Sequence, residues 1–332
     1  MRLLIHEKAY GRVADAIAEH GAVVEPLIVS DDGTIALHGA PVSVDDAAPE
    51  VVWANADAFF GGASRAFMTA ALKSPGLKWV QSGAAGFDHA VFGQFVQKGA
   101  RLTTSHGQAV GMADYVLWGV LDALQGGPGR RAAQAAREWA RLPFREIDGS
   151  HWVVLGFGAI GKGVAARARA FGAQVTGVRR NPAPDPAADR IAAPGDLPAL
   201  LPQADVVVLC APATPETHHI ADAAFFGRMK AGAIFVNVGR GALVDEPALL
   251  AALDRGVPEH AVLDVFETEP LPTESAFWGH PRVTLTGHAS GFSGGNAPRN
   301  DALFVKNLGR YLAGEALLNE ADPKDVLAGM AG

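Results

Sequence analysis

The stretch HWVVLGFGAIG, residues 151–161, decides the fold of this chain. Trp152–Leu155 is a short apolar run typical of a buried parallel strand. A helical pattern follows from Lys162 to Phe171. The glycines between them form G-x-G-x-x-G: the first makes a tight turn, the second lets a pyrophosphate approach the backbone, and the third lets the helix pack against the strand. The stretch predicts a dinucleotide site; the alternative is a glycine-rich turn in an ordinary α/β sheet.

The rhythm of strand and helix continues after this turn. Further strands are predicted at Gln174–Val178, Val206–Cys210, Ala233–Asn237, Ala261–Asp264 and Val283–Thr286. Asn181–Pro198 is rich in Pro and Ala and is predicted to be a surface loop. Alternation of this kind predicts a doubly wound parallel sheet.

The N-terminal part shows α/β signals of its own. Strands are predicted at Arg2–His6, Val51–Trp53, Leu77–Gln81 and Arg101–Thr104. A strongly apolar helix is predicted from Gln108 to Gln125, and such a helix must be buried between layers or in a subunit interface. A second helix, Arg130–Arg141, would carry Trp139, and Asp301–Tyr311 is a further amphipathic helix. We expect two α/β units with a cleft between them.

Composition excludes several classes of protein. The 332 residues are 49% hydrophobic and 19% charged, with a net charge of −7 and no basic block, so nucleic acid is not an expected partner. No apolar run approaches the ~20 residues of a membrane span, and the N-terminus lacks a signal-peptide core. The single cysteine, Cys210, fits a reducing compartment and is better explained as a core residue than as a nucleophile. We expect a cytoplasmic protein.

The end of the second strand after the turn bears on cofactor choice. An acidic residue there bonds the ribose of NAD, whereas arginine favours the 2′-phosphate of NADP. This chain has Arg179 and Arg180, and guanidinium groups grip phosphate bidentately. The pair predicts NADP rather than NAD; the alternative is a solvated basic turn.

Adjacent histidines, His218 and His219, raise the question of a metal. A tetrahedral site needs further ligands at suitable spacing, and none is near in the sequence. We therefore expect no metal.

Chemistry-bearing residues follow three neighbouring strands. Arg240, Glu269 and His288 come after successive predicted strands and would reach one edge of the sheet, where open α/β sheets bind ligands. A carboxylate beside a histidine fixes its tautomer and suits it to acid–base work. Arginine can hold a carboxylate or polarise a carbonyl. The set suits hydride transfer to a 2-keto acid.

The motifs together resemble the D-2-hydroxyacid dehydrogenase family over essentially the whole chain. The resemblance rests on GFGAIG (156–161), TPET (214–217), NVGRGALVDE (237–246), LDVFETEPLP (263–272) and TGH (286–288). It implies a Rossmann domain, residues 100–289, inserted into a flavodoxin-like substrate domain, residues 1–99 plus 290–332. The family is usually dimeric, so a homodimer is expected.

The resemblance also implies roles for residues. Arg240 would bind substrate, Glu269 would pair with His288, and His288 would be the acid–base. Asp264 would contact the nicotinamide carboxamide, and the backbone of Ala85 and Gly86, in the loop AAGFD (84–88), would hold the substrate carboxylate. Trp53 and Asn55 follow a strand and are candidates to line the pocket. The predicted cofactor contacts are Gly156, Gly158, Ala159, Ile160, Gly161, Arg179, Arg180, Cys210, Ala211, Pro212, Thr217, Val238, Gly239 and Asp264.

Some positions depart from the family pattern. Gly287 stands where the family often has proline, and Arg179 replaces the usual acidic residue, as in NADP-linked glyoxylate/hydroxypyruvate reductases. The glycine-rich stretch 291–295 has no counterpart and is a candidate flap over the substrate. The leading hypothesis is an NADPH-dependent reductase of small 2-keto acids. The alternatives are an NAD-linked D-3-phosphoglycerate dehydrogenase-type enzyme and a non-catalytic dinucleotide-sensing scaffold.

Overall fold

The computed structural model describes residues 1–87 and 89–328, so Asp88 of the predicted carboxylate loop lies outside the described residues. The chain divides into two compact units. Unit 1 comprises Met1–Gln108 and the described residues from Gly294 onward, and unit 2 comprises Ala109–Ser293. The predicted boundary at residues 99 and 100 is displaced because β7 (Arg101–Thr103) pairs with β6 (Trp79–Ser82) in the sheet of unit 1. The C-terminal boundary likewise moves from 290 to 294.

Unit 2 is built on a sheet of parallel strands in the order β10-β9-β8-β11-β12-β13-β14. The strands are β8 (His151–Leu155), β9 (Gln174–Val178), β10 (Arg190–Ala192), β11 (Val206–Leu209), β12 (Ile234–Asn237), β13 (His260–Leu263) and β14 (Val283–Leu285). The order reverses beside β8, which is the Rossmann arrangement predicted from the sequence. β10 was not predicted, since it lies inside the stretch assigned to a surface loop.

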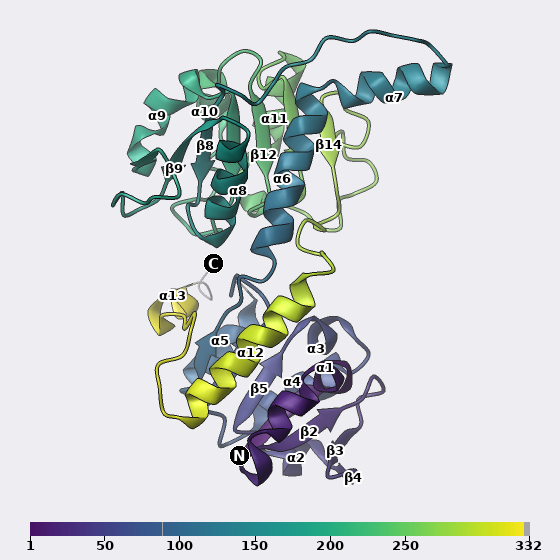
Figure 1. Ribbon diagram of the computed structural model, residues 1–332, viewed down its shortest axis with the longest axis vertical. Helices are drawn as coiled ribbons and strands as arrows, with labels where there is room; N and C mark the ends of the chain where they lie inside the picture. Colours follow the sequence, from purple (N-terminus) through teal and green to yellow (C-terminus); the bar gives the residue numbers. More distant parts are fainter. Residues whose placement is uncertain (88, 329–332) are drawn as a thin grey trace. The chain divides into compact units, whose positions relative to one another are not determined.

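Helices cover both faces of this sheet. On one face α6 (Ala109–Leu124) and α8 (Ala159–Ala170) pack side by side over Trp152 and Val154 (Figure 1). On the other, α9 (Leu197–Leu200), α10 (Ala223–Arg228) and α11 (Glu246–Asp254) cover Val153 and Leu155. Because both faces are covered, Trp152–Leu155 of β8 are all apolar and buried.

The second predicted helix is shorter than expected. α7 (Gly127–Ala136) ends where Arg137 adopts a left-handed conformation, with φ 58°. Trp139 is therefore not helical, and it is 95% exposed. Residues 130–141 have good helix formers, but the left-handed residue ends the helix before the tryptophan is reached.

Unit 1 has the sheet order β4-β3-β2-β1-β5-β6-β7. Its parallel strands are β1 (Arg2–His6), β2 (Glu25–Val29), β5 (Val51–Ala54), β6 and β7, in the order of a flavodoxin-like sheet. Two short strands, β3 (Ile35–Leu37) and β4 (Ala40–Val42), continue it antiparallel and were not predicted. The two-unit α/β prediction is confirmed.

The helices of unit 1 come from both ends of the chain. They are α1 (Glu7–Ala18), α2 (Val44–Ala47), α3 (Ala56–Phe60), α4 (Ser64–Lys73), α5 (Ala90–Gln97), α12 (Asn296–Leu312) and α13 (Pro323–Ala328). α12 runs beside α1 over one face of the sheet (Figure 1). Its Phe304 stacks on Trp53, with ring centroids 5.0 Å apart, and also on Trp79.

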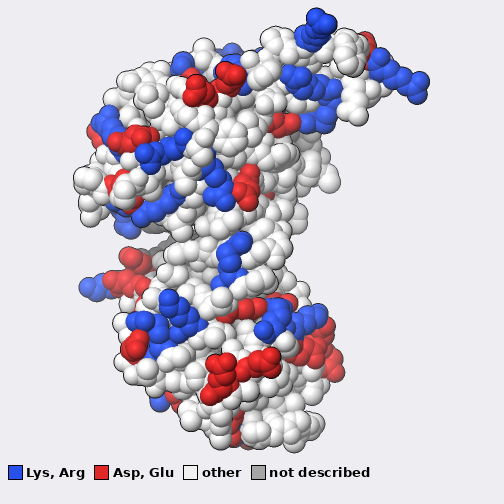
Figure 2. Space-filling model, viewed as in Figure 1, with Lys and Arg blue, Asp and Glu red and all other residues white. Residues whose placement is uncertain are grey.

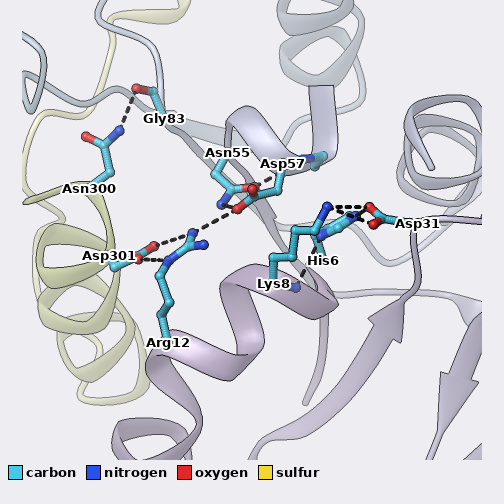
Figure 3. Close-up of polar contacts among 10 residues, drawn as sticks. His6, Lys8, Arg12, Asp31, Asn55, Asp57, Gly83, Asn300 and Asp301 are labelled. Carbon is cyan, nitrogen blue, oxygen red and sulfur yellow. Dashed lines mark hydrogen bonds and ion pairs between the residues drawn. The ribbon is translucent and has the colours of Figure 1, made fainter. Parts of the chain in front are cut away.

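An arginine joins three of these helices. Arg12 of α1 bonds Asp57 of α3 at 2.8 Å and Asp301 of α12 at 2.5 Å (Figure 3). Asp301 is only 6% exposed, so its charge requires this partner. Figure 3 also shows His6 and Lys8 facing Asp31 at the end of β1. These contacts hold α1, α3 and α12 together at the carboxyl edge of the sheet of unit 1.

Charges of both signs are interspersed on the visible face of each unit (Figure 2). Within the described part of the chain, no helix combines the length and the apolar character that crossing a membrane requires.

Candidate active site

The glycine turn of unit 2 has the geometry that a dinucleotide requires. Gly156 has φ +94°, and a Cβ there would lie 2.4 Å from the Ala211 nitrogen. A Cβ at Gly161 would lie 2.5 Å from the Gly156 oxygen, which explains how α8 packs so close to β8. Gly158, the N-cap of α8, has no atom within 4 Å of its Cβ position and makes no side-chain cap bond. The helix N-terminus is therefore open to an anion.

The other predicted cofactor residues lie at the same edge of the sheet. Ala159 and Ile160 begin α8. The loop after β11 is closed by Thr217, whose hydroxyl donates to the Pro212 oxygen at 2.8 Å and accepts the Thr214 amide. Val238 and Gly239 follow β12, and a Cβ at Gly239 would lie 2.8 Å from the Ala211 oxygen. Parallel strands bring these segments together.

Cys210 directly follows β11, and its surroundings do not favour nucleophilic chemistry. Its amide donates to the Leu155 oxygen at 2.8 Å. Burial raises the pKa of its thiol to about 12. A thiol is the unreactive form of cysteine.

Arg179 makes contacts within its own loop. Its guanidinium already donates to the oxygens of Asn181 and Ala183, at 2.9 and 2.7 Å, and to Asp185 at 3.2 Å. Lys162 also binds Asp185, at 2.8 Å, and this contact above all lowers the pKa of that carboxyl. Arg179 therefore supports the loop after β9, and its predicted contact with a 2′-phosphate stays a prediction.

Arg180, the other residue of the pair, is exposed. The pKa of Glu216, in the loop after β11, is lowered chiefly by a hydrogen bond from Thr214. The positive charge of Arg180 lowers it further. Of the two arginines, Arg180 is the one available at the surface for a phosphate.

His288 and Glu269 form the central pair of the site. His288 Nδ1 lies 2.8 Å from Glu269 Oε2, while Glu269 Oε1 accepts the Phe266 amide at 2.9 Å. The histidine side chain is 52% exposed, so its other ring nitrogen can reach a ligand. The carboxylate fixes the Nδ1–H tautomer and leaves Nε2 for proton exchange. The sequence-predicted pair is thus brought together.

The turn that presents His288 is held by a buried carboxylate. Asp264 is fully buried, and its Oδ1 accepts from the Thr286 hydroxyl at 2.5 Å and the Ala289 amide at 2.8 Å, while Oδ2 accepts the Ser290 amide at 3.0 Å. His288 itself has φ +51°, a conformation that costs of order 1–3 kcal/mol and needs such support. This positioning contribution of Asp264 was not foreseen; its contact with a nicotinamide stays a prediction.

Tyr115 of α6 completes the support. Its hydroxyl lies 2.7 Å from the Thr286 hydroxyl, and burial raises the pKa of the phenol to about 12. A neutral phenol can donate to Thr286, which in turn donates to Asp264. Only the structure shows this chain, because Tyr115 is 171 residues from Thr286.

Arg240 follows β12 and caps a short 3₁₀ turn, Gly241–Leu243. A Cβ at Gly241 would lie 2.0 Å from the Phe266 oxygen, so the backbone after Arg240 packs directly on the loop that carries Glu269. Arg240 also donates to its neighbour, the Gly239 oxygen, at 2.7 Å. The arginine and the His–Glu pair are thus held by adjoining loops.

The predicted residues of unit 1 divide into two kinds. The amides of Ala85 and Gly86 donate to no other described residue and remain open to an anion. Trp53, in contrast, is fully buried against Phe304, so its prediction as a pocket residue is wrong. Asn55 is 4% exposed and caps α3, accepting the Ala58 amide and donating to Asp57, which makes it a structural residue.

One cluster was missed from the sequence. The expectation of no metal at His218 and His219 rested on the lack of a further ligand nearby. The structure places Glu267 beside them, with one ligand atom of each residue within 4.8 Å of the others. The separation of 48 positions between His219 and Glu267 hides this juxtaposition from any spacing rule.

Two cavities lie away from this chemistry. The larger, about 270 Å³, is lined by residues such as His151, Gln174 and Arg190 at the amino ends of β8 and β9. Ligands of doubly wound sheets bind at the carboxyl ends. We therefore place the candidate site at the glycine turn and the His–Glu pair.

A Rossmann sheet, an open glycine turn and a carboxylate-paired histidine define a dinucleotide-binding protein of the doubly wound class. Residues 117–290 match the family described as D-isomer specific 2-hydroxyacid dehydrogenase, NAD binding domain. The chain belongs to this family, and unit 2 contains its NAD-binding domain.

Similar proteins include a glyoxylate/hydroxypyruvate reductase A of Serratia proteamaculans, 36% identical over 182 residues, which are 55% of this chain and 58% of that protein. A glyoxylate/hydroxypyruvate reductase B of Klebsiella pneumoniae is 31% identical over 86% of this chain and 93% of its own. The chain also resembles the structure of a D-isomer specific 2-hydroxyacid dehydrogenase from Xanthobacter autotrophicus Py2 in complex with NADPH and MES (27% identity, 98% of each chain, TM-score 0.77). The chain thus spans little more than half of the Serratia reductase.

Proposed function

We propose that this protein is a reductase that converts small 2-keto acids, of the glyoxylate or hydroxypyruvate type, to D-2-hydroxy acids with NADPH. The observation that carries the proposal is the 2.8 Å contact between His288 and Glu269, on a turn fixed by Asp264 at the carboxyl edge of a dinucleotide-binding sheet. The names of the Serratia and Klebsiella relatives support the substrate class, and the NADPH in the Xanthobacter structure supports the cofactor.

The residues have distinct tasks in this reaction. When bound, the reduced nicotinamide supplies the hydride. His288 gives the proton on Nε2 to the keto oxygen, and Glu269 stabilises the imidazolium beforehand through Nδ1. Arg240 polarises the carbonyl with its guanidinium. The amides of Ala85 and Gly86 bind the substrate carboxylate as hydrogen-bond donors.

Cofactor selectivity is assigned to Arg180. Its exposed guanidinium binds the 2′-phosphate, whereas Arg179 holds the loop through Asn181, Ala183 and Asp185. NAD would lack this contact, so NADPH is preferred.

The experiment is a panel of glyoxylate, hydroxypyruvate, pyruvate and phenylpyruvate, each with NADPH and with NADH, followed by absorbance of the reduced nicotinamide. We expect the highest kcat/KM for glyoxylate or hydroxypyruvate with NADPH. Turnover with 3-phosphohydroxypyruvate and NADH alone would favour the phosphoglycerate dehydrogenase alternative. Cofactor binding without turnover of any keto acid would favour the scaffold.

We also propose that the protein is a homodimer. α6 leaves Trp118 48% exposed, and the segment beyond α7 exposes Trp139 and Phe144. Apolar side chains of this size gather at subunit interfaces. Light scattering of the purified chain tests this: the mass of a monomer would contradict it.

A further inference from the structure

His218, His219 and Glu267 form a cluster outside the residues assigned to catalysis. The two imidazole rings stack with centroids 4.0 Å apart, and His219 Nε2 contacts Glu267 Oε1 directly. One donor atom from each residue lies within 4.8 Å of the other two. The set offers two nitrogens and one oxygen close enough together to share one metal ion.

The backbone holds these ligands in place. The His219 amide donates to the Ala242 oxygen at 2.9 Å, and His219 itself has φ +49°, which turns its ring toward the neighbouring loop. The Glu267 amide donates to Glu246 Oε1 at 2.8 Å. The close approach of Gly241 to Phe266 packs the loop after β12, which carries Ala242, against the loop after β13, which carries Glu267. Backbone contacts therefore hold the segments that carry the two histidines and Glu267.

The charge of the surroundings also favours a cation. Glu246, at the start of α11, accepts the backbone amide of Glu267, so a second negative charge lies near the loop that carries Glu267. The two imidazoles and the Glu267 carboxylate meet in a partly exposed position that a hydrated ion can enter. The ion pair with His219 accounts for the Glu267 carboxylate, while the exposed His218 ring, stacked on His219, brings a further nitrogen to the cluster.

We propose that His218, His219 and Glu267 bind a divalent transition metal, Zn²⁺ in particular, with a water molecule as the fourth ligand. Two imidazoles and one carboxylate are the ligand set of open tetrahedral zinc sites. Imidazole nitrogen disfavours Mg²⁺ and Ca²⁺, which prefer oxygen ligands. The metal ties the loop after β11 to the loop after β13.

This proposal is independent of the reductase function. It rests on the three side chains and the two loops, not on a cofactor or a substrate. A bound metal would cross-link residues 212–220 to residues 265–269.

The test measures zinc binding by the 332-residue chain, produced without a polyhistidine tag. Metal is first removed by chelation, and no dinucleotide is added. Competition with a chromophoric chelator gives affinity and stoichiometry, and Co²⁺ in place of zinc reports tetrahedral geometry through its visible absorption. We expect one equivalent of zinc and a thermal midpoint that rises with zinc concentration. His218→Gln, His219→Gln and Glu267→Gln should each weaken binding by about tenfold or more, since even loss of a supporting contact costs about that much.

Matched controls are His151→Gln and Glu274→Gln, which change an exposed imidazole and an exposed carboxylate elsewhere in unit 2. Both should keep the wild-type zinc affinity. His218 is itself exposed, so His218→Gln should fold normally even if His219→Gln perturbs its loop. Absence of a stoichiometric zinc site in the wild type, or equal affinity in the wild type and the three ligand variants, would overturn the proposal.

Discussion

Glu269 bonds His288 Nδ1 with one carboxylate oxygen, at 2.8 Å, and the Phe266 amide with the other, at 2.9 Å. The carboxylate is therefore fixed at both ends, and the imidazole has one orientation. Because Nδ1 of His288 is bonded to Glu269, Nε2 is the ring nitrogen that can exchange a proton with a ligand.

His288→Asn should reduce turnover about 100-fold or more, the usual contribution of a general acid–base, because no proton donor remains at that position. NADPH affinity should stay near the wild-type value. Steady-state kinetics and fluorescence titration of the cofactor measure the two quantities. His151→Asn, in an exposed histidine of β8, is the control. Wild-type turnover in His288→Asn would remove this residue from the mechanism.

Asp264→Asn should lower both stability and turnover. The carboxylate accepts hydrogen bonds from Thr286, Ala289 and Ser290, and an amide cannot accept all of them. We expect a loss of about 2 kcal/mol in the free energy of unfolding, as for a buried group left unsatisfied. Urea unfolding and kcat measure the effects, with Glu274→Gln as the surface control. If stability and kcat both match the wild type, the carboxylate does not position the turn.

The two arginines after β9 should behave differently. Arg180→Ala should raise the KM for NADPH by about 10- to 100-fold, as expected for one charge-assisted bond, and leave NADH nearly unchanged. Arg179→Ala should instead affect both cofactors alike and lower the thermal midpoint, because it releases the loop held through Asp185. A selective loss of NADPH in Arg179→Ala, but not in Arg180→Ala, would reverse the assignment.

His260 should make stability depend on pH. It is 8% exposed, and burial lowers its pKa from 6.5 to about 4. As pH falls from 6.5 to 4, the unfolded chain takes up a proton that the folded chain refuses, so stability falls by up to about 3 kcal/mol over this window. Urea unfolding of His260→Gln should show a shallower pH slope there. An unchanged slope, with His151→Gln as reference, would exclude this contribution.

Regular elements were largely predictable from the sequence, because their patterns are local. β9 lies where the apolar pattern placed it, and α6 differs from its predicted ends by one residue. The strands β3 and β4 have only three residues each, which is too short for a periodic signal.

Side-chain environments were harder to predict. Trp53 follows the start of a strand, but β5 is an interior strand and α12, some 250 residues later, covers its ring. Arg179 has the predicted charge, yet the loop of residues 181–185 determines where its guanidinium lies. His219 meets Glu267 only because β11, β12 and β13 are neighbours in the sheet. Each outcome depends on residues distant in sequence.

The stacking of Phe304 on Trp53 and Trp79 has a consequence for biosynthesis. Unit 2 is one uninterrupted segment, whereas unit 1 needs residues from both ends of the chain. On the ribosome, the first-made strands of unit 1 must wait, with their tryptophans uncovered, until α12 has been translated. Unit 2 emerges completely before that moment. α12, synthesised after all of unit 2, therefore covers the first-made sheet, and until it emerges the nascent chain has an apolar surface that chaperones can bind.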